Sequence, residues 1–383
     1  MTKFTELGLS KPVLTALTEA GYKEPTEIQS RTIDVILSGK DLVASAQTGS
    51  GKTAAFALPI IDCLEEPAEK PRALVLTPTR ELALQVAAQF ELFGKYSGLR
   101  VVTLYGGTSM AQQVRALRNP VDIVVATPGR LIDCLERRFV DLRQVEILVL
   151  DEADRLLDFG FAPQLRRIKT QLPKERQTLL FSATIDRHVA HIAGDFTCDP
   201  ATVKVQGKTV EAESIEQKFL HVHEFGKDAL LLQLLNDMEA SSILVFTRTK
   251  RKATWVKDRL RDANVAAEEI HSDISQAQRE RTLRKYRAGE FAVLVATDVA
   301  ARGLDIPSIS HVINYDLPDT PHDYVHRIGR TGRAGRAGTA FSFISHEQSH
   351  LVRDIEKVVG RKLDDSPVPL RKTLSGRRFG RRR

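Results

Sequence analysis

The stretch from residue 42 to residue 58 constrains the fold more than any other part of the chain. It begins with the apolar segment Leu42–Ser45, continues through a loop that contains Gly49 and Gly51, and ends in an apolar helical pattern at 54–58. A strand that leads through a glycine-containing loop into a helix is typical of folds that alternate strands and helices around a parallel sheet. This pattern indicates the α/β class.

The loop itself matches the phosphate-binding P-loop, with alanine in place of the usual first glycine. Its residues are Ala46, Gln47, Thr48, Gly49, Ser50, Gly51, Lys52 and Thr53. The two glycines let backbone N–H groups approach phosphate oxygens, Lys52 reaches the β- and γ-phosphates, and the Thr53 hydroxyl is a ligand for Mg²⁺. We expect this loop to bind a nucleoside triphosphate together with Mg²⁺.

A second apolar run, Ile147–Leu150, is followed directly by an acidic tetrad, residues 151–154. A run this short and apolar is typical of a buried parallel strand, and open α/β sheets bind ligands at the carboxyl ends of such strands. Carboxylate oxygens at that position suit a phosphate-bound Mg²⁺. Alone, the tetrad could be an ordinary acidic loop, but beside a P-loop it predicts a second part of the nucleotide site.

Apolar strand-like segments alternate with helical patterns in two series along the chain. Besides the two runs above, they lie at 73–76, 101–104, 122–125 and 178–181, and then at 243–246, 293–296, 311–314 and 340–343. This alternation predicts parallel sheets covered by helices, and the polar stretch 206–214 separates the two series. We predict two tandem α/β domains, 1–205 and 215–360, each a mostly parallel sheet flanked by helices, with a linker at 206–214.

The charge of the chain is concentrated at one end. The formal net charge is +7, and all of this excess lies in residues 361–383, which contain proline, glycine and few apolar residues. Such a segment cannot bury a core, so we predict a disordered basic tail that can contact phosphates.

The three cysteines are widely spaced and indicate neither a disulfide framework nor a zinc site. No apolar stretch approaches the length of a transmembrane helix, so we expect no membrane partner and a cytoplasmic location.

Residues 324–336 carry arginines three positions apart, punctuated by glycine. A run of this kind can be a solvated basic loop or a nonspecific nucleic-acid patch. In a chain that already has a phosphate site, we favour a different interpretation, in which these guanidinium groups reach the γ-phosphate. An arginine in that position can stabilise the transition state by about 4 to 7 kcal/mol.

Together these motifs resemble the DEAD-box RNA helicases of superfamily 2, from about Phe4 to about Phe343. The resemblance implies two RecA-like domains that close on ATP and RNA, with RNA-stimulated ATP hydrolysis coupled to local, non-processive unwinding or to remodelling of RNA–protein complexes. Residues 21–29 resemble the family's adenine-reading motif, in which Gln29 pairs with the base edge and Tyr22 stacks on the ring. The short chain and compact basic tail are most similar to the bacterial RhlE-like branch.

The resemblance also implies roles at the phosphates. Glu152 would be the general base or position the water, and Asp151 would hold Mg²⁺. The matched residues of the second domain are His326 and Gln276 in the water and γ-phosphate network, the arginine fingers Arg330 and Arg333, and the ribose contact Asp305. Ser182 and Thr184 match the motif that couples hydrolysis to domain contacts.

Contacts to RNA carry over to both domains. In the first domain they are Pro78, Thr79, Arg80, Gly106, Gly107, Thr127, Pro128, Gly129 and Arg130, and in the second they are Thr247, Arg248, Arg279, Thr297 and Asp298. Hydroxyls, backbone N–H groups and lone arginines suit phosphate and ribose oxygens, so binding should be largely independent of sequence and should select RNA through its 2′-OH. The resemblance also suggests ribosome-assembly or RNA-decay factors as protein partners.

Two other functions fit the same motifs. A DNA helicase or translocase shares the phosphate chemistry, although the Gln29 motif and the acidic tetrad match the RNA-acting family. An ATP-dependent RNA clamp or assembly platform shares all of these motifs, and its hydrolysis would serve mainly for release. The preference for RNA or DNA as ATPase activator tests the first alternative, and strand separation on a short duplex tests the second.

Overall fold

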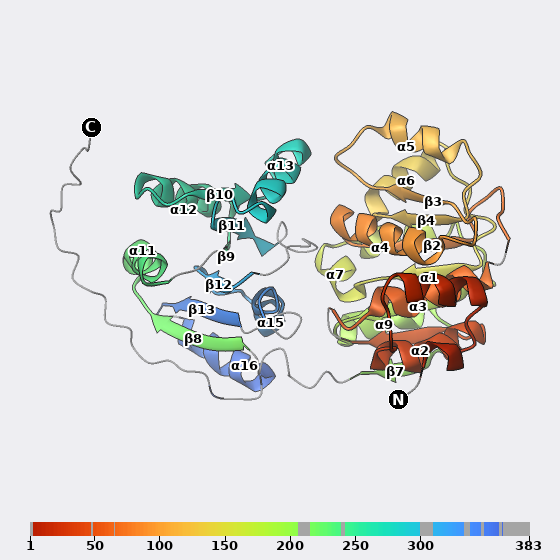
Figure 1. Cartoon of the computed structure of the whole chain (residues 1–383), viewed down its shortest axis with the longest axis horizontal. Helices are drawn as coiled ribbons and strands as arrows, with labels where there is room; N and C mark the ends of the chain where they lie inside the picture. The colour runs from red at the N-terminus through yellow and green to blue at the C-terminus, as the bar shows by residue number, and fades with distance from the viewer. Residues whose placement is uncertain are drawn as a thin grey trace. The chain divides into compact units, whose positions relative to one another are not determined.

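The computed structural model describes residues 3–46, 49–64, 66–205, 215–238, 242–298, 309–332, 338–345, 348–359 and 362. The chain divides into two compact units, residues 1–207 (unit 1) and 208–383 (unit 2) (Figure 1). The predicted linker, 206–214, and the predicted disordered basic tail, apart from Lys362, lie outside the described residues.

Unit 1 is built around a seven-stranded sheet with the order β3-β4-β2-β5-β6-β1-β7, in which the paired strands are parallel. The strands are β1 (Leu42–Ser45), β2 (Ala73–Leu76), β3 (Val101–Leu104), β4 (Ile123–Ala126), β5 (Ile147–Leu150), β6 (Gln177–Ser182) and β7 (Ala201–Lys204). The helices are η1 (Phe4–Glu6), α1 (Lys11–Glu19), α2 (Glu27–Leu37), α3 (Lys52–Cys63), α4 (Arg80–Phe93), α5 (Met110–Leu117), α6 (Pro128–Glu136), α7 (Ala153–Asp158), α8 (Ala162–Lys169) and α9 (Arg187–Phe196).

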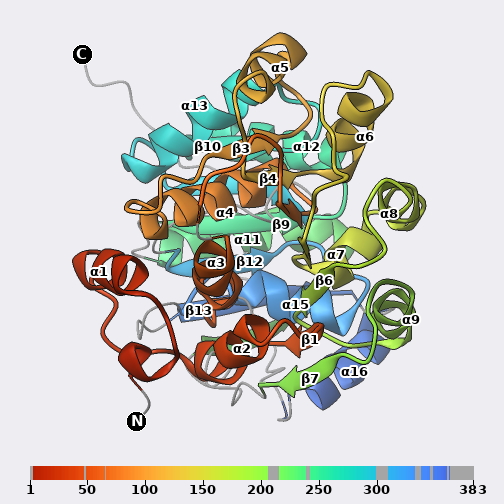
Figure 2. The same ribbon diagram turned by 90° about the vertical axis from the view of Figure 1, so that its right-hand side faces the viewer.

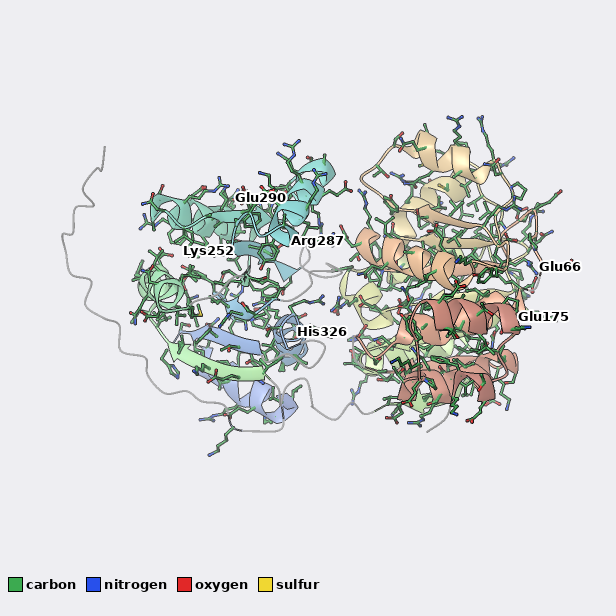
Figure 3. The ribbon with its side chains drawn as sticks, in the orientation of Figure 1. Glu66, Glu175, Lys252, Arg287, Glu290 and His326 are labelled. Carbon is green, nitrogen blue, oxygen red and sulfur yellow. The ribbon has the colours of Figure 1, made fainter. Side chains whose placement is uncertain are left out.

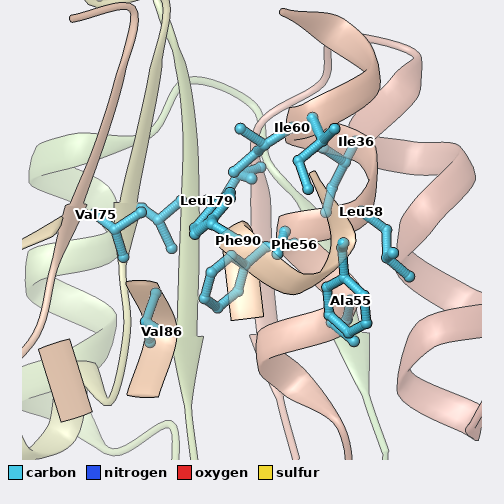
Figure 4. Close-up of a cluster of buried hydrophobic side chains, with 14 of the residues drawn as sticks. Ile36, Ala55, Phe56, Leu58, Ile60, Val75, Val86, Phe90 and Leu179 are labelled. Carbon is cyan, nitrogen blue, oxygen red and sulfur yellow. The ribbon is translucent and has the colours of Figure 1, made fainter. Parts of the chain in front are cut away.

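Both faces of this sheet are buried, because helices pack on each of them. Helices α1 to α4 pack on one face and α6 to α9 on the other, and each set contributes to its own apolar cluster (Figure 2). Successive strand residues belong alternately to the two clusters. In the first cluster the ring centroid of Phe56 lies 6.1 Å from that of Phe90 (Figure 4). The distance between the ring centroids of Phe56 and Phe181 is 5.3 Å. The core thus fixes α3, whose amino end carries the P-loop lysine, against the sheet.

Unit 2 has a six-stranded sheet with the order β10-β11-β9-β12-β13-β8, also with parallel pairing. Its strands are β8 (Ile215–His221), β9 (Ile243–Thr247), β10 (Ala267–Ile270), β11 (Val293–Thr297), β12 (His311–Asn314) and β13 (Gly338–Ile344). Its helices are η2 (Glu224–Gly226), α11 (Lys227–Asp237), α12 (Lys250–Asp262), α13 (Gln276–Arg287), α15 (Pro321–Ile328) and α16 (Ser349–Val359).

Helices also cover both faces of the second sheet. Residues of α13, α15 and α16 join one apolar cluster, and residues of α11 and α12 join the other. The predicted α/β class, with parallel sheets flanked by helices, is therefore confirmed in both units. Three strands that the sequence analysis did not predict, β7, β8 and β10, lie at or next to the sheet edges.

Candidate nucleotide and RNA site

The predicted phosphate-binding and RNA-binding segments of unit 1 follow the carboxyl ends of its strands. Parallel strands end at the same edge of a sheet, so these segments meet there. The neighbouring strands β5, β6 and β1 lead into 151–154, 183–184 and 46–53, whereas β3, β4 and β2 lead into 105–108, 127–130 and 77–80. At this end of the sheet, the predicted nucleotide-binding segments therefore lie on one side and the predicted RNA-binding segments on the other, and we call these two sides the nucleotide half and the RNA half.

The P-loop ends where α3 begins. Gly51 is the N-cap of α3 with a φ of 92°, a left-handed conformation that favours glycine. The ammonium group of Lys52 is buried and donates a hydrogen bond of 2.6 Å to the carbonyl oxygen of Ala46, at the start of the loop. Gly49 and Ser50 are described, while Gln47 and Thr48 lie outside the described residues. Lys52 thus lies across the loop that is predicted to hold the phosphates.

Gln29 lies against this loop, although it is far from it in sequence. The side chain is only 1% exposed. Its Oε1 accepts a hydrogen bond from the backbone N–H of Thr26 at 2.9 Å, and its Nε2 donates to the carbonyl of Gly51 at 3.1 Å. A Cβ atom at Gly51 would approach Gln29 Nε2 to 2.4 Å, so a larger residue there would displace the Gln29 side chain. Gln29 therefore ties the start of α2 to the P-loop, and its contacts within the described residues use one of its two N–H groups and one acceptor position of its oxygen.

Tyr22, the predicted stacking residue, lies between α1 and α2. Its ring is partly exposed and packs edge-on against Phe93, with 5.4 Å between ring centroids. Tyr22 thus keeps 36% of its surface exposed, so part of the residue is accessible.

Asp151 is the buried carboxylate of the nucleotide half, with 2% of its surface exposed. Its Oδ1 accepts a hydrogen bond from the backbone N–H of Glu152 at 3.0 Å. Burial and then the neighbouring Glu152 charge raise the pKa of Asp151 to about 7, while Lys52 opposes this shift. A buried, hard oxygen ligand of this kind suits a divalent cation, and the half-buried Thr53 at the start of α3 supplies a hydroxyl in the same half of the site.

Glu152 has a left-handed backbone, with φ 50° and ψ 54°, where β5 passes into α7. Its Oε2 forms an ion pair of 3.2 Å with Nη1 of the buried Arg155. Such a conformation is uncommon for a residue other than glycine and is often found at functional sites. The turn and the ion pair together fix the direction of the Glu152 carboxylate.

Asp154 connects the acidic tetrad to the end of β6. Its Oδ2 accepts hydrogen bonds from the backbone N–H groups of Ala183 and Thr184 at 3.1 and 3.2 Å and from the Thr184 hydroxyl at 3.4 Å. The backbone N–H of Asp154 in turn donates to Ser182 Oγ at 3.2 Å. The predicted coupling residues, Ser182 and Thr184, are therefore joined to the acidic tetrad, a contact that the sequence analysis did not assign to Asp154.

The RNA half contains two arginines that contact residues absent from the sequence prediction. The guanidinium of Arg80 lies 4.5 Å from the centroid of the Tyr105 ring, and Nη1 of Arg130 donates to Gln113 Oε1 at 3.0 Å. The remaining predicted residues are exposed glycines or positions at helix starts, namely Pro78, Thr79, Gly106, Gly107, Thr127, Pro128 and Gly129.

Unit 2 carries its predicted residues on the segments that follow β9, β10, β11 and β12. Thr247 ends β9, Arg248 forms an ion pair of 2.9 Å with Asp319, and Arg279 lies on α13. His326 lies on α15, followed by the buried Arg330 (Figure 3). Gln276 is the first residue of α13, but its side chain lies outside the described residues, as do Asp305 and Arg333.

Arg327 belongs to the arginine run at 324–336, whose guanidinium groups the sequence analysis expected at the γ-phosphate, and its contacts within unit 2 were not predicted. It is 3% exposed, and its Nε and Nη2 donate to the two carboxylate oxygens of Asp298 at 2.6 and 2.7 Å. Asp298, a predicted RNA residue, is thereby tied to α15. The helical spacing of the sequence could have indicated that Arg327 is buried, because Arg327 shares a face of α15 with the buried Tyr324 and Ile328.

Comparisons with known proteins agree with these motifs. A family model described as DEAD/DEAH box helicase matches residues 26–192, and one described as Helicase conserved C-terminal domain matches residues 226–335. The DEAD-box ATP-dependent RNA helicase CshA of Bacillus cereus is 44% identical over 369 residues, which is 96% of this chain and 70% of that protein. The chain belongs to the DEAD-box helicase family. The CshA protein of Geobacillus kaustophilus is also 44% identical, over 98% of this chain and 81% of its own length.

Solved structures of DEAD-box proteins share the fold. S. cerevisiae Dbp5 bound to RNA and ADP BeF3 has a TM-score of 0.84 at 32% identity, covering 97% of this chain and 96% of that chain. Mss116p bound to ssRNA and AMP-PNP has a TM-score of 0.86 at 29% identity, covering 96% and 80%. The predicted tandem RecA-like architecture and the predicted enzyme class, an ATP-hydrolysing RNA helicase, are confirmed. Assignment to the RhlE-like branch stays a prediction.

No helix in the described part of the chain combines the length and the apolar character needed to cross a bilayer.

Proposed function

We propose that this DEAD-box protein uses Mg²⁺-dependent ATP hydrolysis for local, non-processive separation of RNA duplexes or for remodelling of RNA–protein complexes. The observation that supports the proposal is that the segments predicted to bind nucleotide, after β5, β6 and β1, and those predicted to bind RNA, after β3, β4 and β2, meet at the carboxyl ends of one sheet. Structural neighbours that hold RNA together with ADP BeF3 or AMP-PNP support both ligand classes. A cytoplasmic location and ribosome-assembly or RNA-decay partners stay predictions.

Within unit 1, each residue of the nucleotide half has a physical task. Backbone N–H groups of the P-loop and the Lys52 ammonium bind the phosphates, which requires Lys52 to leave the Ala46 carbonyl. Asp151 and Thr53 would hold Mg²⁺, which when bound neutralises phosphate charge. Glu152, held by Arg155, accepts a proton from the attacking water or orients that water.

Unit 2 completes the chemistry in this proposal. His326 and Gln276 would contact the water and γ-phosphate network, Arg330 and Arg333 would stabilise charge on the transferred phosphoryl group, and Asp305 would contact the ribose. Because these groups belong to a different unit from the P-loop, hydrolysis should be slow until RNA engages both units. This proposal therefore predicts that RNA stimulates ATP turnover.

We expect ATP turnover to be low without nucleic acid and to rise by at least about tenfold with single-stranded RNA, but not with DNA of the same sequence. A coupled phosphate-release assay measures this. A labelled RNA duplex of about ten base pairs should separate with ATP, and the rate should fall steeply as the duplex lengthens. Equal stimulation by DNA would favour a DNA translocase, and ATP-dependent RNA retention without strand separation would favour a clamp.

The position of Gln29 leads to a second prediction, which concerns the preference for ATP over GTP. The N–H and the acceptor position that Gln29 does not use within the described residues match the edge of adenine, which also offers one donor and one acceptor, whereas guanine reverses them. Gln29→Ala should narrow the preference in kcat/KM for ATP over GTP by about tenfold. Gln29→Glu keeps the acceptor for the Thr26 N–H but loses both donors, so it separates helix capping from base recognition. Equal hydrolysis of ATP and GTP by the wild-type protein would contradict this assignment.

A further inference from the structure

Gln113 is an unusual residue for its helix. It is 8% exposed, and it is the buried residue of α5, a short helix that otherwise lies at the surface. A buried amide is costly unless its donors and acceptors are satisfied. All four of its hydrogen-bonding positions are used within the described structure, so this side chain is placed for polar contacts rather than for packing.

The partners of Gln113 are two segments of the RNA half. Its Oε1 accepts from the backbone N–H of Tyr105 at 3.2 Å and from Arg130 Nη1 at 3.0 Å. Its Nε2 donates to the carbonyl of Tyr105 at 3.0 Å and to the Thr108 hydroxyl at 2.8 Å. Arg130 also contacts this segment directly, because its Nη2 donates to the Thr108 carbonyl at 3.1 Å. The two glycines, 106 and 107, are therefore held from both sides.

Tyr105 extends these contacts to a third segment. Its ring lies 4.5 Å from the guanidinium of Arg80, the first residue of α4, in a cation–π arrangement. Arg80, Tyr105, Gln113 and Arg130 thus form a continuous series of contacts across the segments that follow β2, β3 and β4. We call these four residues the RNA-side network.

Ordering a glycine loop costs conformational entropy, and a site that is ordered before its ligand arrives avoids that cost during binding. Resting on the proposed function, we propose that Gln113 and Tyr105 are positioning residues: they hold the glycine loop, Arg80 and Arg130 in the arrangement that binds RNA. Gln113 acts through the loop backbone and Arg130, and need not touch RNA itself. The role requires an amide at position 113. A glutamate there would lack the N–H donors for the Tyr105 carbonyl and the Thr108 hydroxyl, and a leucine could form none of the four hydrogen bonds.

The first test is RNA affinity in the full-length protein. Gln113→Ala should raise the Kd for a fluorescent single-stranded RNA, measured by anisotropy with a non-hydrolysable ATP analogue, by about tenfold or more. The Kd for a fluorescent ATP analogue without RNA should stay within about twofold, because the network lies over β3, β4 and β2. The matched control is Gln112→Ala, which removes the same side chain from an exposed neighbouring position and should leave both constants unchanged.

A double-mutant cycle shows whether Gln113 acts through Arg130. If it does, Gln113→Ala should weaken RNA binding much less in an Arg130→Ala background than in the wild type. Tyr105→Phe keeps the ring beneath Arg80 and should bind RNA nearly as well as the wild type, whereas Tyr105→Leu should lose affinity. The Tyr105 pair tests the network even if Gln113→Ala fails to fold, as judged by circular dichroism.

The outcomes separate this inference from the proposed function. If the wild type shows neither RNA binding nor RNA-stimulated turnover, the proposed function fails. If the wild type binds RNA but Gln113→Ala and Tyr105→Leu bind it equally well, the positioning role is wrong and the helicase assignment is untouched. Additive effects of Gln113→Ala and Arg130→Ala would also overturn the role assigned to Gln113.

Discussion

Replacing Glu152 by glutamine is expected to lower RNA-stimulated ATP turnover by about two to four orders of magnitude. The substitution keeps the size of the side chain and leaves an amide oxygen that can still accept from Arg155, so the turn from β5 into α7 should persist. It removes the carboxylate that accepts a proton or orients the water. ATP affinity should change by no more than about threefold, because the phosphates are bound by the P-loop.

Steady-state turnover at saturating RNA and equilibrium binding of a fluorescent ATP analogue measure the two quantities separately. Lys52→Ala should behave in the opposite way and weaken nucleotide binding itself. Glu146→Gln is a matched control, because Glu146 is exposed at the amino end of the same strand and should leave turnover unchanged. Full turnover in Glu152→Gln would exclude Glu152 as the general base.

Most of the strands that sequence analysis predicted are buried on both faces; the partly buried edge strand β3, Val101–Leu104, was predicted as well because its residues are mainly apolar. Ile147–Leu150 and Ala73–Leu76 are short apolar runs, and each is a central strand with the predicted bounds. The strands it missed lie at or near edges and contain polar residues, as in Ala267–Ile270, which holds two glutamates. An edge strand has one exposed side and loses the continuous apolar pattern on which the prediction depends.

The same distinction applies to the candidate site. The P-loop and the acidic tetrad are contiguous motifs, so the sequence located them, and the parallel sheet then places both at one edge. Contacts between distant segments are different, because Gln113 with Arg130 and Arg327 with Asp298 depend on how strands are ordered. The sequence does show that Gln113 and Arg327 are polar residues on the buried face of a helix. The spacing of residues along that helix cannot indicate which distant residue each of them contacts.

Contact between Arg327 and Asp298 leads to the largest expected effect on stability. The Arg327 guanidinium donates to both Asp298 oxygens, to Asn314 Oδ1 at 3.2 Å and to the Asp316 carbonyl at 2.6 Å, and it lies 4.9 Å from the centroid of the Phe246 ring. Removing this buried guanidinium leaves Asp298, whose side chain is 25% exposed, without its charged partner, and it leaves Asn314 Oδ1 and the Asp316 carbonyl without this donor. Arg327→Ala should therefore lower the free energy of unfolding of unit 2 by about 3 to 5 kcal/mol.

The single tryptophan of the chain, Trp255, lies on α12 of unit 2, so its fluorescence during urea unfolding reports on this unit. Arg327→Lys keeps the positive charge but cannot reproduce the forked, planar contact with Asp298, so its loss should be smaller yet measurable. Arg353→Ala removes an exposed arginine of α16 and should change the unfolding free energy by less than about 0.5 kcal/mol. If Arg327→Ala instead unfolds at the same urea concentration as the wild type but loses RNA affinity, Arg327 serves to orient Asp298 for RNA rather than to stabilise the fold.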